Sequence, residues 1–240
     1  MLNKIKEMSI IALLTAKGDN TLRNKNLLKI NGKSILSFPC LEAKKISSIK
    51  SFFASSESKK ILKEAKKYGY FPIKRPKYLS RKKSKHEDVL RHSVTFLNKN
   101  NIKFDIAVVL LGNAPLIKSK WIEDCINKIT KDRTITSVVP VYLDNDHNPI
   151  RAKKITNGYL KNFFISKNKY SSNRQDLPGS YFLSHNFWVI RKNAIIKSDG
   201  DSPWSFLGKK VLPYVIEKTI DIHDKTDFHL LNTIIKKKLF

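Results

Sequence analysis

The chain has 240 residues, of which 41% are hydrophobic, so it is long enough for one sizeable α/β domain with its own core. Its formal net charge of +27 raises nucleic acid as a partner, but the lysines are spread along the whole chain and indicate a solvated surface that attracts anionic ligands. No apolar run reaches the roughly 18 residues of a membrane span and the N-terminus lacks a signal-peptide pattern, so we expect no membrane span and no specific nucleic-acid binding.

Two cysteines, Cys40 and Cys125, each fall within an apolar helical pattern. This placement favours buried, reduced thiols over a disulfide or a metal site. We therefore expect a cytoplasmic protein.

The first structured stretch is an uninterrupted apolar run at residues 10–14, which is typical of a strand buried on both faces. A loop follows that contains the turn or cap residues Gly18, Asp19, Asn20 and Thr21. Its basic residues are Lys17, Arg23 and Lys25. Such a loop can hold phosphates through backbone N–H groups and cationic side chains, although this density of basic residues is near the background of the chain. It is not a Walker A loop, because no Gly-Lys-Ser/Thr follows at the required spacing, and it is not a Rossmann fingerprint, because Gly18 is its only glycine.

The remaining elements alternate between strand and helix, which predicts a mostly parallel sheet. Strands are predicted at 51–55, 104–111, 134–142, 187–190 and 219–222, and helices at 35–46, 59–68, 88–97, 121–129 and 226–236. Asp224 has the side chain to cap the last helix. Residues 144–183 are polar, aromatic and turn-rich, with a hairpin signal at Asn157-Gly158, and we interpret them as an excursion from the sheet.

Three places on or just after predicted strands carry polar side chains. Glu57, in Ser55-Ser56-Glu57, is interpreted as part of a helix cap. Asn113 follows the strongest strand, at the end where open α/β sheets bind ligands, and the alternative is an ordinary turn begun by Pro115. Asp221 and His223 are two apart on a predicted strand, so both could face one metal ion.

The first loop resembles the N-terminal signature of the cytidylyltransferases that activate acidic sugars, the CMP-sialic acid synthetases and their relatives. Ala16-Lys17-Gly18 stands for Ala-Arg-Gly in that signature, and Lys25-Asn26 matches its Lys-Asn. Gly32-Lys33-Ser34-Ile35 stands for Gly-Lys-Pro-Leu. The loop is one residue shorter than in the family and lacks its proline.

Later motifs of the same family follow in the same order. They are Arg75-Pro76, Pro115-Leu116, Arg174-Gln175-Asp176-Leu177-Pro178 with Tyr181, and residues 219–228, which align without gaps on Ser-Ile-Asp-Ile-Asp-Thr-x-x-Asp-Phe. The chain departs from the family at four places: it has Leu111 for Gln, Asn113 for Thr or Asp, Ser184-His185 for Asn-Gly, and His223 for the second Asp.

The resemblance implies a three-layer nucleotidyltransferase fold, with a mostly parallel central sheet, in one domain spanning residues 1–240. It implies an arm at about 144–183 that makes a homodimer. The implied reaction moves CMP from CTP to the anomeric hydroxyl of a nonulosonic, sialic-type acid and releases pyrophosphate.

The resemblance also implies roles for individual residues. Lys17, Arg23 and Lys25 would screen the triphosphate, and Ala16, Gly18, Asn26, Arg75 and Asn113 would line the nucleotide site. Arg174, Gln175, Tyr181 and His185 would contact the sugar acid. Asp221 would hold Mg²⁺, with His223 either beside it as a poorer ligand or in another role.

Four alternatives remain open from the sequence. Two are close in chemistry: another sugar nucleotidyltransferase, such as one acting on octulosonate, and a glycosyltransferase that uses a nucleotide sugar. A relative that kept the fold and lost activity is the third, because of the shortened loop, Asn113 and His223. The fourth is a nucleic-acid-binding protein, for which aromatic residues interleaved with basic ones should occur, and no such module is evident.

Overall fold

The computed structural model describes residues 8–18, 22–165 and 168–240. Within these residues, eight strands form one sheet in the order β10-β7-β11-β6-β1-β4-β5, with β12 beside β7. They are β1 (Ile10–Thr15), β4 (Ile49–Ser56), β5 (Phe71–Lys74), β6 (Ile106–Leu111), β7 (Ser137–Leu143), β10 (Tyr181–Leu183), β11 (Phe187–Arg191) and β12 (Val211–Val215). Strands β5, β4, β1 and β6 are mutually parallel, and β11 runs antiparallel between β6 and β7. The expectation of a mostly parallel central sheet is confirmed.

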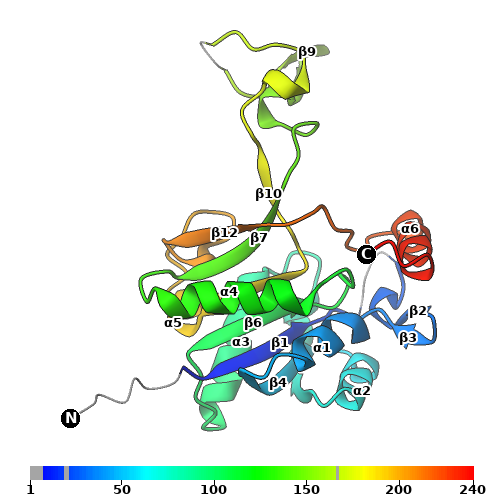
Figure 1. Ribbon diagram of the computed structural model, residues 1–240, viewed down its shortest axis with the longest axis vertical. Helices are drawn as coiled ribbons and strands as arrows, with labels where there is room; N and C mark the ends of the chain where they lie inside the picture. The colour runs from blue at the N-terminus through cyan, green and yellow to red at the C-terminus, as the bar shows by residue number, and fades with distance from the viewer. Residues whose placement is uncertain (1–7, 19–21, 166–167) are drawn as a thin grey trace.

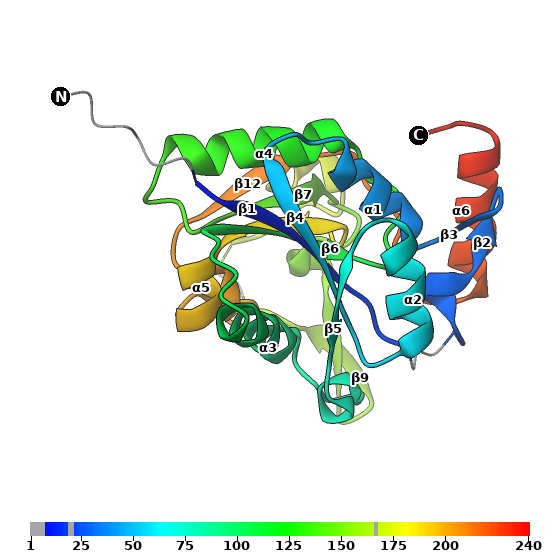
Figure 2. The ribbon, with the colours of Figure 1, turned by 90° about the horizontal axis from the view of Figure 1, so that it is seen from below.

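Helices cover both faces of the sheet because its central strands are apolar on both sides. In β1, Ile10, Ala12 and Leu14 belong to one buried cluster, and Ile11 and Leu13 belong to the other. The first cluster includes residues of α1 (Ser37–Lys44), α2 (Lys59–Lys67) and α4 (Ser119–Lys131), and the second includes residues of α3 (His86–Lys99) and α5 (Lys192–Lys197). Figure 2 shows α4 and α1 on one side of the sheet and α3 and α5 on the other.

A third, smaller apolar cluster lies at the side of the domain. There α6 (Lys225–Lys236) packs against the hairpin of β2 (Lys29–Ile30) and β3 (Lys33–Ser34). Ile222, just before α6, is fully buried in this cluster. Asp224 caps α6 by accepting a hydrogen bond from the N–H of Asp227, whose side chain accepts one in return, so the predicted cap is confirmed.

An arm rises from the body between β7 and β10 (Figure 1). It contains the hairpin of β8 (Lys153–Thr156) and β9 (Tyr159–Asn162), as predicted from Asn157-Gly158, which both have positive φ in the turn. The short helices η3 (Pro149–Arg151) and η4 (Arg174–Asp176) complete it. The predicted end of the arm at residue 183 is too late, because residues 181–183 form β10 and pair with β7 in the central sheet.

The predicted strand at 219–222 is wrong. These residues are irregular, and the strand that pairs with β7 is β12, eight residues earlier in the sequence. β12 contains Pro213, and it tolerates this residue without an N–H because β7 is its sheet neighbour on one side. The predicted strands at 104–111 and 134–142 begin two and three residues too early.

Cys40 and Cys125 are free and buried among the helices of the first face, as predicted. Burial raises the pKa of both thiols above the usual range for cysteine. Among the described residues, no helix has the length and apolar character needed to cross a membrane.

Candidate functional site

The four parallel strands β1, β4, β5 and β6 end side by side, at the carboxyl end of the sheet. A cavity of about 200 Å³ opens there, at the place where open α/β sheets bind ligands. It is lined by Thr15, Ala16, Lys17, Lys25, Asn26, Arg75, His86, Leu111 and Asn113. Six of these were singled out from the sequence, so the structure brings together Ala16, Lys17, Lys25, Asn26, Arg75 and Asn113.

The loop after β1 is held at three consecutive residues by three different side chains. The Ala16 carbonyl accepts a hydrogen bond from Arg75 Nη2 at 2.9 Å, and the Lys17 carbonyl accepts one from Asn26 Nδ2 at 2.8 Å. The Gly18 N–H donates to Glu57 Oε1 at 2.7 Å. The backbone that enters the loop is therefore fixed before any ligand arrives. The turn predicted at Asp19, Asn20 and Thr21 lies outside the described residues.

Glu57 does not cap a helix, contrary to the prediction. Residue Ser58 is the N-cap of α2, and no side chain caps there. Instead Glu57 Oε2 accepts hydrogen bonds from Arg75 Nη2 at 2.9 Å and from Ser80 Oγ at 2.6 Å. Burial disfavours its charged form, but the hydrogen bonds from Ser80, Gly18 and Arg75 outweigh burial and lower its pKa to about 2. The sequence signal that we missed is a carboxylate placed directly after a strand that ends in the site.

Arg75 is 5% exposed and directs its guanidinium toward protein groups as well as the cavity. Its Nη2 donates to both Ala16 and Glu57, and its Nε is buried without a hydrogen-bond partner. Burial lowers the pKa of Arg75, and Glu57 opposes that shift. Arg75 therefore holds the loop in addition to lining the cavity.

Lys25, in the short helix η1 (Lys25–Leu27), joins the cavity to the irregular segment that carries Asp221. Its Nζ donates to the Ile222 carbonyl at 2.6 Å. Asn113 binds the same segment, because its carbonyl accepts from the Ile222 N–H at 2.9 Å and its Nδ2 donates to Asp221 Oδ2 at 3.4 Å. Burial lowers the pKa of Lys25, and the nearby Asp221 opposes that shift. This segment thus reaches the site without being a strand.

The side chains of Asp221 and His223 are in contact, but they are not on a strand as predicted. His223 Nε2 is 2.7 Å from Asp221 Oδ2 in an irregular segment, and their side chains are 70% and 30% exposed. No group of three or more His, Cys, Asp or Glu side chains that could hold a metal ion is found among the described residues. The residues present fit a hard cation that takes one protein carboxylate and completes its shell with ligand oxygens and water.

His86 lines the cavity and was not recognised in the sequence. Its Nε2 is 3.2 Å from Thr15 Oγ1, and its ring lies 5.3 Å from that of Trp188 and 6.0 Å from that of Phe206. Burial among these groups lowers its pKa to about 4, with smaller contributions from the charges of Arg75 and His185. The cavity therefore contains a neutral imidazole at ordinary pH. No sequence pattern marks it, since a histidine at the start of a helix is commonplace.

The four residues expected to contact a sugar acid are not gathered in one place within the chain. His185 lies in the body, its ring 5.8 Å from that of Trp188; burial lowers its pKa, and the nearby Asp221 opposes that shift. Tyr181 is on β10 and 56% exposed. Arg174 and Gln175 line a different cavity, of about 340 Å³, where the arm joins the body. Arg23, expected to screen a triphosphate, is exposed and does not line the cavity at the end of β1.

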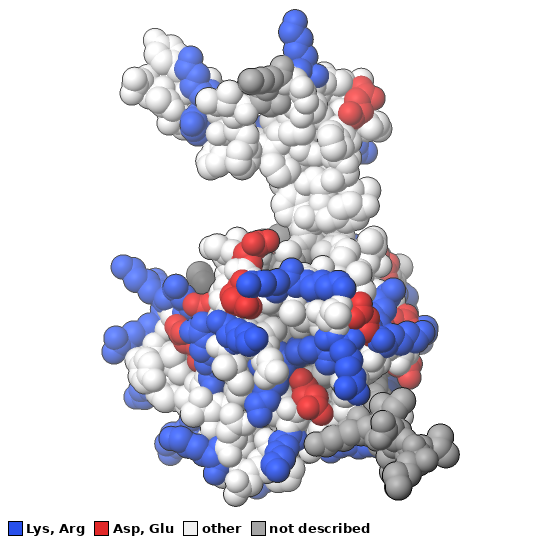
Figure 3. All heavy atoms as spheres, turned by 90° about the vertical axis from the view of Figure 1, so that its left-hand side faces the viewer, with Lys and Arg blue, Asp and Glu red and all other residues white. Residues whose placement is uncertain are grey.

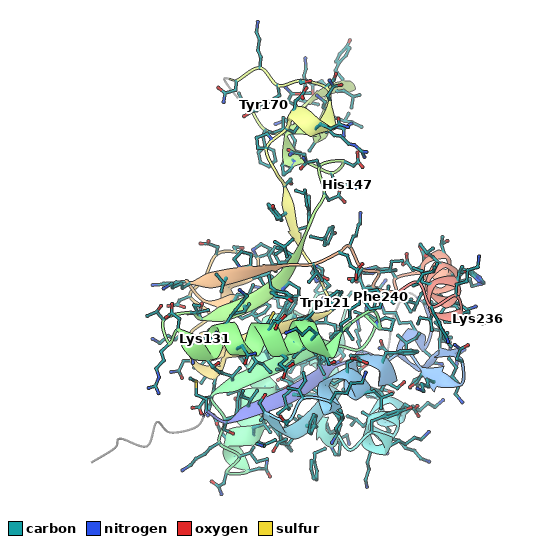
Figure 4. The ribbon with its side chains drawn as sticks, viewed as in Figure 1. Trp121, Lys131, His147, Tyr170, Lys236 and Phe240 are labelled. Atoms are coloured by element: carbon teal, nitrogen blue, oxygen red, sulfur yellow. The ribbon has the colours of Figure 1, made fainter. Side chains whose placement is uncertain are left out.

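Arg174 has a local partner on the arm. Its Nη1 lies 2.8 Å from Asp146 Oδ2, and both side chains are 56% exposed. In Figure 4 His147 and Tyr170 of the same arm lie well above the helices and the sheet of the body. A single copy of the chain therefore keeps the residues of η4 apart from the cavity at the end of β1.

Comparison with known proteins gives consistent matches. The profile of a family described as cytidylyltransferase matches residues 18–196. Post-translational flagellin modification protein B of Campylobacter coli is 23% identical over 95% of this chain and 96% of that protein. Pseudaminic acid cytidylyltransferase of Campylobacter jejuni is 22% identical over 80% of this chain and 82% of that protein. N-acylneuraminate cytidylyltransferase of Escherichia coli is 24% identical over 95% of this chain, which spans only 52% of that protein.

Solved structures show the same fold at lower identity. The complex of CMP:2-keto-3-deoxy-manno-octonic acid synthetase with CTP matches with a TM-score of 0.70 at 13% identity, over 96% of this chain and 99% of that one. A 4-diphosphocytidyl-2C-methyl-D-erythritol synthase matches with a TM-score of 0.67 at 10% identity, over 95% of this chain and 98% of that one. The three-layer nucleotidyltransferase fold expected from the sequence is thereby confirmed.

Proposed function

The chain belongs to the cytidylyltransferase family, and from that membership we propose that it moves CMP from CTP to the anomeric hydroxyl of a nonulosonic, sialic-type acid. The family match and the named relatives support a CTP-using sugar cytidylyltransferase. The choice of a sialic-type acid rests on the activities named for two of those relatives.

The observation that carries the proposal is the preorganised loop at the end of β1. Three consecutive backbone groups, from Ala16 to Gly18, are held by side chains from separate elements, and Lys17 and Lys25 line the cavity beside them. A fixed loop with cationic side chains suits a triphosphate, because phosphoryl transfer depends mainly on positioning and on neutralising charge.

The proposed step is a single displacement at phosphorus. The oxygen of the sugar's anomeric hydroxyl forms a bond to the α-phosphorus of CTP, the bond from that phosphorus to the bridging oxygen breaks, and pyrophosphate leaves with the electron pair. The hydroxyl proton goes to solvent or to a basic group nearby. Lys17 and Lys25 reduce the repulsion between the triphosphate and the anionic sugar acid.

Mg²⁺ fits the residues around Asp221, which would hold it together with phosphate oxygens and water. When bound, such an ion neutralises charge on the phosphates. Within the chain, Asn113 and Lys25 keep the segment of Asp221 against the cavity through their bonds to Ile222 and Asp221. His223 contacts Asp221 and so affects the orientation of that carboxylate.

We also propose that two copies of the chain associate through their arms. The arm exposes large apolar side chains, among them Ile155, Leu160 and Ile165 at 77%, 72% and 96%. In such a dimer Arg174 and Gln175 of one copy meet the sugar acid bound to the other, which gives them the carboxylate-binding role that their chemistry suits.

Pyrophosphate release tests the reaction directly. Purified protein is incubated with CTP, ATP, GTP or UTP and with a panel of sialic, pseudaminic and octulosonic acids, with Mg²⁺ present. We expect release with CTP and a nonulosonic acid. Release with octulosonate alone would move the proposal to that sugar, and equal release with all four nucleotides would contradict a cytidine-specific site.

A further inference from the structure

Glu57 lies behind the loop and outside the cavity. It follows β4, its side chain is 13% exposed, and it is absent from the residues that line the cavity. Nevertheless its two carboxylate oxygens contact three separate segments: Gly18 after β1, Arg75 after β5, and Ser80 at the end of η2 (Lys77–Ser80). One carboxylate therefore joins the ends of two strands and a short helix to the loop.

The contact between Glu57 and the loop requires a glycine. A Cβ at residue 18 would lie 2.7 Å from Ser58 Cβ and 3.1 Å from Glu57 Oε1. Gly18 therefore allows its N–H to approach the carboxylate more closely than any other residue could. This explains physically why the single glycine of the loop stands where it does.

Charge also favours the arrangement. Arg75 is almost fully buried, and a buried cation without a partner is costly, so the carboxylate of Glu57 stabilises it. Arg75 in turn donates to the Ala16 carbonyl. The loop is thus held directly at Gly18 and indirectly at Ala16 by the same acidic side chain.

We propose that Glu57 is a positioning residue for the nucleotide: it holds the backbone from Ala16 to Gly18 in the conformation that receives the triphosphate, through its bonds to Gly18, Arg75 and Ser80. It acts through the loop and Arg75, and it touches neither substrate. The expected effect on the KM for CTP rests on the proposed function, whereas the expected effect on the loop conformation does not.

The test compares Glu57→Gln with Glu64→Gln. Glu64 is a matched control, because its side chain is 15% exposed and also forms an ion pair, but with Lys67 of its own helix at 2.7 Å. Glu57→Gln should raise the KM for CTP and lower kcat/KM by about 10- to 100-fold, since small displacements of positioning groups have effects of that size. The KM for the sugar acid should change less, and Glu64→Gln should match the wild type.

A second measurement needs no turnover. Hydrogen exchange at the amide of Gly18 should be faster in Glu57→Gln than in wild type and unchanged in Glu64→Gln, because the bond from this amide to the carboxylate is weakened. Glu57→Asp keeps the charge on a shorter side chain. Its exchange rate at Gly18 and its KM for CTP should fall between those of the wild type and those of Glu57→Gln.

The outcomes separate the two proposals. Wild-type KM for CTP together with unchanged exchange at Gly18 in Glu57→Gln would overturn the positioning role. An equal rise in both KM values with a large fall in melting temperature would also overturn it, because that result indicates general destabilisation. Faster exchange in a protein that never releases pyrophosphate from CTP would leave the role in the loop intact and reject the proposed function instead.

Discussion

The cavity at the end of β1 and the arm hold their polar groups in opposite ways. Around the cavity, Arg75 and Glu57 are nearly buried, and their bonds run to backbone groups of segments distant in the sequence. On the arm, Arg174 and Asp146 are both 56% exposed and bind each other. On the face shown in Figure 3, Lys and Arg side chains cover much of the body, whereas the neck of the arm shows neither acidic nor basic atoms.

The difference indicates which region is complete in a single chain. The contacts around the cavity form within one chain, because the buried Arg75 and Glu57 bind each other and the loop after β1. Both strands of the arm hairpin are exposed along their whole length. An isolated two-stranded hairpin is marginally stable in water, so the arm gains most from a second surface. The predictions below test this contrast.

The largest effect is expected at Asp221. Asp221→Asn should lower turnover by about 10²- to 10³-fold, as for removal of a main electrostatic stabiliser, while circular dichroism and melting temperature stay near those of the wild type. His223→Ala should cost less, and His223→Asp should keep or improve the use of Mg²⁺. Asp124→Asn, at a surface ion pair with Lys120, serves as the control. Full activity of Asp221→Asn with an inactive His223→Ala would reject the proposed metal site.

The second effect concerns Arg174. Arg174→Ala should raise the KM for the sugar acid by about 10-fold or more, because a charge-assisted hydrogen bond is lost, with the KM for CTP unchanged. Its stability should barely change, since exposed ion pairs contribute about 0–1 kcal/mol. An equal mixture of Arg174→Ala and Asp221→Asn should show about a quarter of wild-type activity if each site forms between two copies. Half of the dimers are then mixed, and each mixed dimer has one intact site out of two. Activity that is no greater than the sum of the separate variants would show that each site belongs to one chain.

A third prediction addresses the apolar surface of the arm. Leu160→Glu should weaken self-association by about 10-fold or more in sedimentation experiments, because a charge then enters a desolvated interface. Lys161→Glu, a neighbouring exposed change of charge, is the control. Melting of the single chain should be little affected, since Leu160 is 72% exposed. A variant that remains as associated as the wild type would place the interface elsewhere.

The smallest effect is the pH dependence caused by His86. Its pKa is about 4 in the folded protein, below its ordinary value of 6.5, so the unfolded chain binds more protons between these values. The contribution of His86 to the free energy of unfolding is therefore fully present above pH 6.5. It declines as the pH falls toward 4, by at most about 1.4 kcal/mol per pH unit. When unfolding by denaturant is measured between pH 4.5 and 7, His86→Gln should reduce the change of the unfolding free energy with pH. His229→Gln, on the exposed side of α6, should leave it unchanged.

Several parts of the fold could be predicted because they depend on neighbours along the chain. The apolar run of β1, the Asn157-Gly158 turn and the Asp224 cap each follow from residues within a few positions of one another. The strand predicted at 219–222 failed for the same reason. Its local composition suits a strand, but the edge beside β7 is occupied by β12, and a competition for one sheet edge is decided by the whole sheet.

The sequence by itself determined the alternation of elements, the family resemblance and six of the residues that line the cavity. Only the tertiary structure decided that Glu57 binds the loop, that His86 lies in the cavity, and that Arg174 is kept apart from it. The physical reason is separation along the chain. Gly18 and Glu57 are 39 residues apart, and Ala16 and Arg75 are 59 apart, so their contacts exist only after parallel strands have paired and aligned their ends.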